Sequence, residues 1–417
     1  MVGFVSSENR LVVSNEFSRA YNLHGITAMS VQRVIKDIQA GRLTITMKEN
    51  GHRLDELIAF ASRLNPRRGY LFVSRVLGKH IPVRPSKMNS VHAELAQLID
   101  LLGDTAYVVG MAETAVGLGA GVARHLGRLH DYSLFQHTTR FLVSDPWLRI
   151  QEAHSHADTM HMARLEDDVS LAVQTTKDLV LVDDEISTGR TLAQLAHALV
   201  AQPELYSIRR LHIVSLVSWL DDEARAQLLA LLPQRIEVNF VHLMAGTFTF
   251  IAAPDYQATL PDNVDVNFCD VLTAKSHQEP DPLPLERNGL YGMVFGKSEE
   301  LLPAEILSRP LNINKPHVVY GMGEFLDIPF QTALALEIAG MDILFQSSTR
   351  SPIALGDEVV NRLEHPAPGD SSKTHFLYNP PLQHVPLAFD GIGLPHLSQA
   401  LEASHRQRAD EEQEQVA

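Results

Sequence analysis

The chain has 417 residues and a formal net charge of −15, with 45% hydrophobic and 20% charged residues. This composition provides apolar material for two or three domains and excludes a mainly disordered chain. The single cysteine, Cys269, excludes a disulfide framework and a cysteine-based zinc finger within one chain. The excess of acidic residues argues against a general nucleic-acid partner, although a local basic pocket is compatible with it.

Membrane and export signals are not visible in the sequence. It has no run of about eighteen apolar residues, so we expect no membrane-spanning helix. The first residues, MVGFVSSENR, lack a basic segment followed by an apolar one, so we expect no signal peptide. Together with the low cysteine content, these features favour the reducing cytoplasm as the location.

The N-terminal part is predicted to contain short mixed elements. The alternating segment Leu43–Met47 predicts a strand before a turn at Asn50 and Gly51. The segment Arg53–Leu64 has apolar residues at helical spacing and predicts a helix.

A basic segment, from Leu57 to Ala93, contains no Asp or Glu. In a chain of net charge −15, this is a local reversal of sign. Two interpretations stay open: a solvated basic face, or a wall that faces an anionic ligand. The basic residues of this segment are Arg63, Arg67, Arg68, Arg75, Lys79, Arg84 and Lys87.

From residue 91 onwards, predicted strands and helices alternate. The continuous apolar run Leu179–Val182 is typical of a strand buried on both faces. Such alternation predicts an α/β fold with a mainly parallel sheet flanked by helices. The predicted strands are Ala106–Gly110, Tyr132–Gln136, Leu179–Val182, Leu211–Val217 and Ile236–Leu243, and the predicted helices are Val91–Leu102, Thr114–Leu126, Thr188–Val200 and Asp221–Leu232.

A second, smaller α/β unit is predicted after residues 254–286, which contain five prolines and are typical of a domain boundary. Its predicted elements are the strand His317–Tyr320, the helix Ile328–Ala339 and the strand Ile343–Phe345. The acidic end, Ser404–Ala417, is expected to be a frayed helix or a disordered tail. The predicted division is 1–90 for an N-terminal hood or flanking segment, 91–253 for the core, 254–286 for a linker, 287–395 for the second unit and 396–417 for the acidic tail.

The most informative string is LVLVDDEISTGRT, from Leu179 to Thr191. A buried strand leads to two carboxylates, Asp183 and Asp184, and a short turn then opens a helix. Ligands of α/β sheets bind beyond the carboxyl ends of the strands, and N–H groups at a helix N-terminus bind phosphate. Gly189 lets a phosphate approach the backbone, and the acid pair can bind a sugar diol or a hydrated magnesium ion. The pattern therefore fits a ribose 5-phosphate.

This string resembles the signature of the type I phosphoribosyltransferases, which bind phosphoribosyl pyrophosphate (PRPP). The resemblance covers the apolar run, both acids and the hydroxyl–glycine turn. It implies that Asp183 and Asp184 are catalytic residues that bind PRPP and hold magnesium through water. The PRPP-binding residues that it implies are Asp183, Asp184, Glu185, Ser187, Thr188, Gly189, Arg190 and Thr191.

A second string, AYVVGMAETAVGLG, is a predicted strand followed by small residues and a helix. In the family the equivalent loop takes the pyrophosphate. Glu113 departs from the pattern because a carboxylate repels pyrophosphate unless magnesium intervenes; it could instead hold the metal, an amine of the acceptor, or the start of its own helix. A Rossmann dinucleotide site is disfavoured, because the glycines at Gly117 and Gly119 start inside the helix and have the wrong spacing. The pyrophosphate loop that the resemblance implies consists of Gly110, Met111, Ala112, Glu113, Thr114 and Ala115.

The polar stretch Thr138–Asp168 has little periodicity. In the family a flexible catalytic loop stands at this place and closes over PRPP. The resemblance therefore implies that Arg140, His154 and His156 are catalytic residues that contact the leaving pyrophosphate. Two alternatives stay open: a transition-metal site, or a polar loop without a role. The residues of the alternative metal site are His154, His156, His161 and Asp158.

Two turns of the second unit follow its predicted strands, Gly321–Glu324 and Ser348–Pro352. If those strands are parallel, both turns lie at the same edge of the sheet. They then form either a second anion site, with Arg350 as a forked donor, or an ordinary pair of surface turns. The predicted residues of the second anion site are Gly321, Gly323, Glu324, Thr349, Arg350 and Ser351.

The tetrapeptide Thr349–Pro352 also carries a resemblance. The chain is similar to two-part proteins in which an orotate-phosphoribosyltransferase-like domain precedes a TRSP domain, and which occur in bacterial gene clusters for tellurite resistance and stress. Further strings that support this are NPRRGYLFVSRVLGKHIPV, from Asn65 to Val83, and GMGEF and FQSSTRSPI in the second unit. The TRSP domain implies no established chemistry.

The function that these resemblances imply is that of a cytoplasmic phosphoribosyltransferase. It would use PRPP and magnesium to form an N-ribosyl 5-phosphate, a nucleotide-like product, from an unidentified small acceptor in a stress-associated pathway. Two alternatives stay open: a PRPP- or nucleotide-sensing regulator without turnover, and an assembly protein with the TRSP domain as a docking module. Because members of this fold are often dimers, a homodimer is expected, and neither a membrane nor a nucleic acid is expected as a partner.

Overall fold

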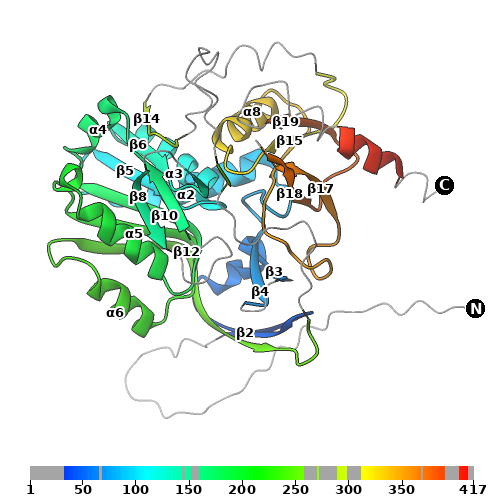
Figure 1. The fold of residues 1–417 in the computed structure, drawn as a ribbon, viewed down its shortest axis with the longest axis horizontal. Coiled ribbons are helices and arrows are strands. Elements are labelled where there is room, and N and C mark those ends of the chain that lie inside the picture. Colours follow the sequence, from blue (N-terminus) through cyan, green and yellow to red (C-terminus); the bar gives the residue numbers. More distant parts are fainter. Residues whose placement is uncertain are drawn as a thin grey trace, which may run out of the picture.

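The computed structural model describes residues 32–64, 68–142, 146–151, 159–257, 270–271, 289–297, 311–367, 370–389 and 403–411. In these residues the chain forms one large sheet, flanked by helices, and a second region that begins at residue 311. The α/β fold with a mainly parallel sheet and a second, smaller α/β region is confirmed (Figure 1).

The main sheet has eight strands in the order β1-β2-β12-β11-β10-β5-β6-β14. Its five central strands, β12 to β6 in that order, are parallel, whereas β1, β2 and β14 pair antiparallel at the two edges. Four of the central strands, β11, β10, β5 and β6, are buried on both faces over most of their length, as parallel strands between helical layers are, whereas many residues of β12 are at least partly exposed. The strands are β1 (Arg33–Ile38), β2 (Gly41–Glu49), β5 (Thr105–Gly110), β6 (Tyr132–His137), β10 (Asp178–Ile186), β11 (Arg210–Ser218), β12 (Glu237–Ala252) and β14 (Met293–Gly296).

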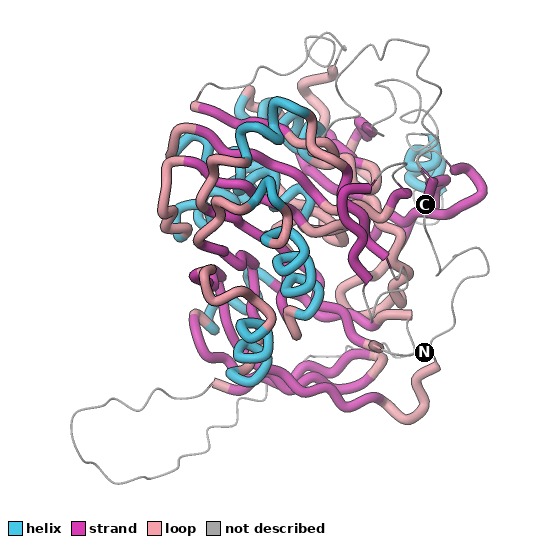
Figure 2. The backbone as a smooth tube through the Cα atoms, turned by 60° about the vertical axis from the view of Figure 1, so that its left-hand side comes forward, coloured by secondary structure: helices cyan, strands magenta, loops and turns pink. Residues whose placement is uncertain are grey.

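Helices cover both faces of the main sheet (Figures 1 and 2). The buried residues of α5 recur at helical spacing, so this helix lays one apolar side on the strands, whereas α3 is buried on nearly all sides. The sequence predicted α2 to start at Val91, but it begins six residues earlier at Pro85, a residue whose fixed φ suits the first turn. The helices are α2 (Pro85–Leu98), α3 (Ala115–Leu129), α4 (Asp167–Val173), α5 (Arg190–Val200) and α6 (Asp222–Ala230), with the 3₁₀ turn η2 (Pro203–Leu205) after α5.

The second region contains a three-stranded parallel sheet in the order β16-β15-β19. Its strands are β15 (His317–Gly321), β16 (Ile343–Ser347) and β19 (Val385–Phe389), and the helix α8 (Asp327–Ile338) connects the first two. A hairpin of β17 (Arg362–Ala367) and β18 (Asp370–Tyr378) follows β16. Residues 403–411 form a helix, which agrees with the helical alternative for the acidic end.

The predicted helix over Arg53–Leu64 is wrong. A 3₁₀ turn, η1 (Gly51–Arg53), and the single turn α1 (Leu54–Leu57) lead directly into β3 (Ile58–Ser62), which pairs with β4 (Tyr70–Ser74). All five residues of β3 are buried, so the strand has no polar face. An apolar run of this length cannot be distinguished from a helix by periodicity alone, and the pairing with β4 decides the outcome.

The polar stretch after β6 also contains strands that its sequence did not indicate. β7 (Phe141–Leu142) pairs with β13 (Asp270–Val271), and β8 (Pro146–Gln151) forms a hairpin with β9 (Thr159–Ala163). His154 and His156 lie outside the described residues. Most of the predicted linker 254–286 lies outside them as well, so the division into domains stays a prediction.

The basic segment joins the main sheet to the second region. Val83 and Met88 share a hydrophobic cluster with Phe330 and Phe345, and β3 and β4 share another with Phe376 and Tyr378. The backbones are also paired, since the amides of Val83 and Phe345 each donate to the carbonyl of the other at 3.0 and 2.8 Å. Two of the hydrophobic cores are therefore common to the basic segment and the second region.

Among the described residues, no helix combines the length and the hydropathy needed to cross a membrane.

Phe345→Ala tests whether these shared cores make the chain one cooperative unit. Phe345 is 1% exposed and packs edge-to-face on Phe330. We expect a loss of about 3–5 kcal/mol in the free energy of unfolding. The two tryptophans, Trp147 and Trp219, both precede the second region, so their fluorescence in a urea titration reports the unfolding of the main sheet.

The control is Ile338→Ala, whose side chain is 78% exposed at the end of α8 and whose loss is expected within about 0.5 kcal/mol. A tryptophan transition that does not move in Phe345→Ala would show that the second region unfolds independently.

Candidate functional site

The connections of the main sheet diverge between β5 and β10. From β5 the chain crosses through α3 to β6, on one side, and from β10 it crosses through α5 to β11, on the other. Such a switch point opens a crevice at the carboxyl ends of the two strands, where α/β sheets bind their ligands. The strands pair in register up to Val182 opposite Gly110, and the Met111 amide donates to the Val182 carbonyl at 2.9 Å. The acid string and the predicted pyrophosphate loop therefore lie side by side.

The three acids of the string have different surroundings. β10 continues to Ile186, so Asp183, Asp184 and Glu185 stand in its last residues rather than after it. Glu185 accepts from the Arg68 guanidinium and from the indole Nε1 of Trp219, at 3.0 Å for the latter, and is thereby fixed within the protein. Asp183 and Asp184 are half-buried, and the Asp184 amide donates to the Asp183 carboxylate at 3.0 Å.

Burial, and next to it the carboxylate of Glu185, raise the pKa of Asp184 to about 6. A carboxyl group with this pKa exchanges its proton near neutral pH, so a cation bound beside it favours the ionised form.

The turn before α5 keeps the helix N-terminus open at this edge of the sheet. Gly189 precedes the helix with a φ of 65°, a left-handed conformation that glycine adopts at low cost. Thr188 and Arg190 are exposed, and the first turn of any helix carries N–H groups without an intrahelical acceptor. The turn Ser187–Thr191 is therefore available to an anion.

The predicted pyrophosphate loop is held by Thr138, the residue that follows the neighbouring strand β6. The Ala112 amide donates to the Thr138 hydroxyl at 2.9 Å, and the Thr138 amide donates to the Gly110 carbonyl at 3.0 Å. A Cβ on Gly110 would lie 2.7 Å from the Ala115 carbonyl oxygen, so the loop closes too tightly there for a side chain. The peptide bond between Ala112 and Glu113 is cis.

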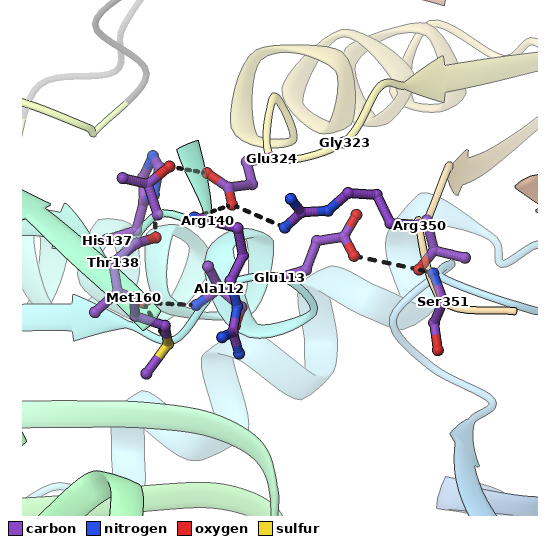
Figure 3. Close-up of polar contacts among 12 residues, drawn as sticks. Ala112, Glu113, His137, Thr138, Arg140, Met160, Gly323, Glu324, Arg350 and Ser351 are labelled. Atoms are coloured by element: carbon purple, nitrogen blue, oxygen red, sulfur yellow. Dashed lines mark hydrogen bonds and ion pairs between the residues drawn. The ribbon is translucent and has the colours of Figure 1, made fainter. Parts of the chain in front are cut away.

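Glu113 points towards the second region (Figure 3). One of its oxygens lies 3.1 Å from Lys79 Nζ, and the other accepts from the Thr349 hydroxyl at 3.2 Å. Burial opposes ionisation of Glu113, but Lys79 and Arg350 outweigh it and lower the pKa of this carboxyl to about 2. The charge of Glu113 is therefore already compensated by cations of the chain.

Lys79, the cation beside Glu113, is buried, at 1% exposure. Its ammonium donates to the carbonyl of Ser348 at 2.6 Å and to that of Gly323 at 3.4 Å. Burial lowers the pKa of Lys79, and Glu113 opposes this shift. The Lys79 ammonium thus links the basic segment to both turns of the second region.

The two turns of the second region also contact the segment after β6. The Glu324 carboxylate accepts from the Thr139 hydroxyl at 2.6 Å and from the Arg140 amide at 2.8 Å. Arg350 Nη2 lies 3.7 Å from the same carboxylate, and the Gly323 amide donates to the Ser348 hydroxyl at 2.9 Å. The predicted second anion site is therefore not separate: its turns abut the pyrophosphate loop, and Arg350 faces carboxylates of this chain (Figure 3).

Part of the basic segment finds its acidic partners within the chain. Four of its cations make ion pairs with carboxylates from elsewhere in the sequence. These four charges serve contacts within the chain, and the two interpretations of the segment as a whole stay predictions. The pairs are Arg68–Glu185, Arg75–Glu358, Lys79–Glu113 and Arg84–Asp342.

The other predicted loop residues are only partly described. Arg140 is 9% exposed, and its Nη2 lies 3.5 Å from the Ala112 carbonyl, at the pyrophosphate loop. His161 is buried in β9, opposite Arg149 in β8. The described residues contain no group of three or more His, Cys, Asp or Glu that could hold a metal ion, and with His154 and His156 outside them the alternative metal site stays a prediction.

Three residues of this site were not among the predicted ones: Lys79, Thr138 and Thr139. Lys79 stood in the basic segment, but no pattern there separates it from six other cations. Thr138 and Thr139 directly follow β6, and the signal that could have found them is their position at the carboxyl end of a strand next to β5.

Each of the two parts of the chain matches a model of a known protein family. Residues 57–247 match the family model described as "Phosphoribosyl transferase", and residues 299–394 match the one described as "TRSP domain C terminus to PRTase_2". No curated protein matches the chain.

Solved structures similar to the chain include three adenine phosphoribosyltransferases. The one from Rhodothermus marinus has 18% identity and a TM-score of 0.31, over 46% of this chain and 96% of that chain. The one from Trypanosoma brucei, in complex with AMP, pyrophosphate and ribose-5-phosphate, has 10% identity and a TM-score of 0.34, over 47% and 82%. The one from Leishmania donovani has 14% identity and a TM-score of 0.31, over 55% and 86%.

Lys79→Met is expected to destabilise the protein by about 3 kcal/mol, because it leaves Glu113 buried without its ammonium partner. The double variant Lys79→Met/Glu113→Gln removes both charges and is expected to lose clearly less than the sum of the two single variants. Urea unfolding of the four proteins in a double-mutant cycle measures this coupling. Additive losses would mean that the two side chains do not interact.

The raised pKa of Asp184 predicts a dependence of stability on pH. The folded state binds this proton more tightly than the unfolded state, so the ligand-free protein loses stability as the pH rises from 3.8 to about 6. Asp184→Asn has no proton to lose. Its free energy of unfolding, relative to that of the intact protein, should therefore rise over this range and become constant above it. Urea unfolding of both proteins at several pH values tests this, and parallel curves would contradict it.

Proposed function

We propose that this chain, which belongs to the phosphoribosyltransferases with a TRSP domain C-terminal to the transferase domain, transfers the 5-phosphoribosyl group of PRPP to a nitrogen atom of a small acceptor. The family makes the chain a pentosyltransferase. The use of PRPP, the acceptor nitrogen and the release of pyrophosphate are our proposal.

One observation carries it: the acid pair, the open turn before α5 and the pyrophosphate loop meet at the switch point between β5 and β10. A turn that binds phosphate beside two carboxylates suits a ribose 5-phosphate, and a second loop of mostly small residues at the end of the adjacent strand suits a diphosphate. PRPP carries all three groups on one molecule.

We assign the 5-phosphate to the turn Ser187–Thr191 and the ribose hydroxyls to Asp183 and Asp184. The pyrophosphate lies along the loop Gly110–Ala115, with Arg140 beside it. Glu185 holds Arg68 and Trp219 in place. His154 and His156, which stand between β8 and β9 in the sequence, would contact the pyrophosphate.

The reaction breaks the bond between the anomeric carbon and the pyrophosphate oxygen, which leaves with the bonding electron pair. The acceptor nitrogen donates a pair to the same carbon, and its proton passes to solvent. The transition state resembles an oxocarbenium ion, so little covalent chemistry is asked of the protein. Orientation of the two reactants and stabilisation of the leaving charge provide most of the acceleration.

Magnesium fits the acid pair. Asp183 and Asp184 offer the carboxylate oxygens that this ion prefers, and the described residues offer it no complete cage of their own. Such a site holds magnesium with water and substrate oxygens as the remaining ligands. When bound, the ion would neutralise part of the pyrophosphate charge.

The alternative of a PRPP- or nucleotide-sensing regulator uses the same residues without turnover. We favour the enzyme because the acid pair and the cation Arg140 accompany the pyrophosphate loop. The tellurite-resistance and stress pathway, the homodimer and the division of the chain stay predictions. We also retain the acceptor as a small molecule of unidentified structure.

Isothermal titration with PRPP, with and without magnesium, tests the proposal. We expect the intact protein to bind PRPP with a dissociation constant of about micromolar magnitude, only with magnesium. Asp183→Asn/Asp184→Asn should abolish this binding because it removes both the diol acceptors and the metal ligands.

The matched control is Asp100→Asn, since Asp100 is exposed at the opposite edge of the sheet, before β5, and its binding should equal that of the intact protein. If the intact protein does not bind PRPP, the proposal fails. If the acid variant binds it as tightly as the control does, the assignment of the acid pair fails.

A further inference from the structure

The TRSP domain reaches the transferase site at two separate points. Thr349 donates to Glu113 in the pyrophosphate loop after β5, at 3.2 Å. Glu324 accepts from Thr139 and from the Arg140 amide in the segment after β6, at 2.6 and 2.8 Å. Both loops follow strands beside the switch point, and both are contacted from turns that follow strands of the TRSP sheet.

The two contacts belong to one buried network (Figure 3). Glu324 is 6% exposed and Thr349 is 1% exposed. Arg350 stands between Glu324 and Glu113, and Lys79 donates to the carbonyl of Ser348. Charge-assisted hydrogen bonds in such a place have little competition from water, so they hold their partners firmly.

Apolar packing beneath this network keeps the same two parts in contact. Leu326 shares a small buried cluster with Ala112 and Val116, at the start of α3. Further along α3, Arg124 makes a buried ion pair with Asp327 at 2.6 Å. The TRSP turn therefore lies directly on the pyrophosphate loop and on the helix that the loop opens.

We infer that Glu324 and Thr349 of the TRSP domain are positioning residues of the phosphoribosyltransferase site, which hold the two loops that receive the pyrophosphate of PRPP. The inference rests on the proposed function. The side chains act through Glu113, Thr139 and Arg140 rather than by touching PRPP. The TRSP domain is then part of the catalytic unit rather than a module that docks other proteins.

The inference predicts different effects on the binding of the two ends of PRPP. The pyrophosphate loop is hydrogen-bonded to a TRSP turn through Thr349 and Glu113, whereas the 5-phosphate turn Ser187–Thr191 is bonded within itself, from the Arg190 amide to the Thr188 hydroxyl. Removing the hydrogen bonds of Glu324 or of Thr349 should therefore weaken the binding of magnesium pyrophosphate and leave the binding of ribose 5-phosphate nearly unchanged. A general loss of stability would weaken both probes.

Calorimetric titration of the full-length protein with these two probes is the test. Thr349→Val removes the hydroxyl without changing the size of the side chain. Glu324→Gln keeps the size of the side chain but replaces one acceptor oxygen by an NH₂ group. This group cannot accept from the Thr139 hydroxyl or from the Arg140 amide, so one of the two hydrogen bonds is lost. We expect each variant to bind magnesium pyrophosphate at least about tenfold more weakly and ribose 5-phosphate within about twofold of the intact protein.

The matched control is Thr332→Val, in α8 of the same domain. Thr332 is also 1% exposed, but its hydroxyl donates to the Ile328 carbonyl of its own helix, at 2.8 Å. Its binding of both probes should equal that of the intact protein. Thermal unfolding shows whether each variant is folded. If either Thr349→Val or Glu324→Gln does not fold, the binding data of the other variant decide the test.

The outcomes distinguish the two claims. If the intact protein binds neither probe, the proposed function fails and the inference fails with it. If the intact protein binds both probes but the folded variants bind pyrophosphate normally, the inference alone is wrong. Equal weakening of both probes also overturns it, because the effect would then not be local to the pyrophosphate loop.

Discussion

The ion pair between Lys79 and Glu113 joins the three parts of the chain on which the site depends. Lys79 is almost fully buried and also donates to the Ser348 carbonyl, while Glu113 belongs to the pyrophosphate loop. Burying a charge is costly unless its partner stands beside it. The pair therefore requires the basic segment, the transferase core and the TRSP turns to be assembled together, and it compensates the charge of the one carboxylate in the loop that we assign to the pyrophosphate.

The same constraint accounts for the distribution of charge along the sequence. The segment from Leu57 to Ala93 has no acid of its own because its carboxylate partners come from the loop after β5, from β10 and from the second region. Around these pairs the apolar side chains of the segment complete two cores with Phe345 and Phe376. A TRSP domain assembled in this way is a structural part of the transferase, and its contacts reach the loops that we assign to the pyrophosphate.

The sequence predicted those elements that can be recognised from the residues of the element itself and its immediate neighbours in the chain. Leu179–Val182 is buried on both faces, and the acids and the turn that follow it needed no distant partner to be recognised. β3 was mistaken for a helix because its burial comes from β4 and from the second region. The sequence also could not show that the turns of the predicted second anion site contact the loop of Glu113, since Arg350 and Glu324 meet Glu113 and Thr139 only in the folded chain.

A crystal structure of the full-length protein with magnesium and PRPP tests the central claim most directly. The account predicts the 5-phosphate in the turn Ser187–Thr191, the ribose hydroxyls at Asp183 and Asp184, and the pyrophosphate along Gly110–Ala115 with Glu113 still turned to Lys79 and Thr349. PRPP bound elsewhere, or Glu113 released from Lys79 to face the pyrophosphate, would contradict it.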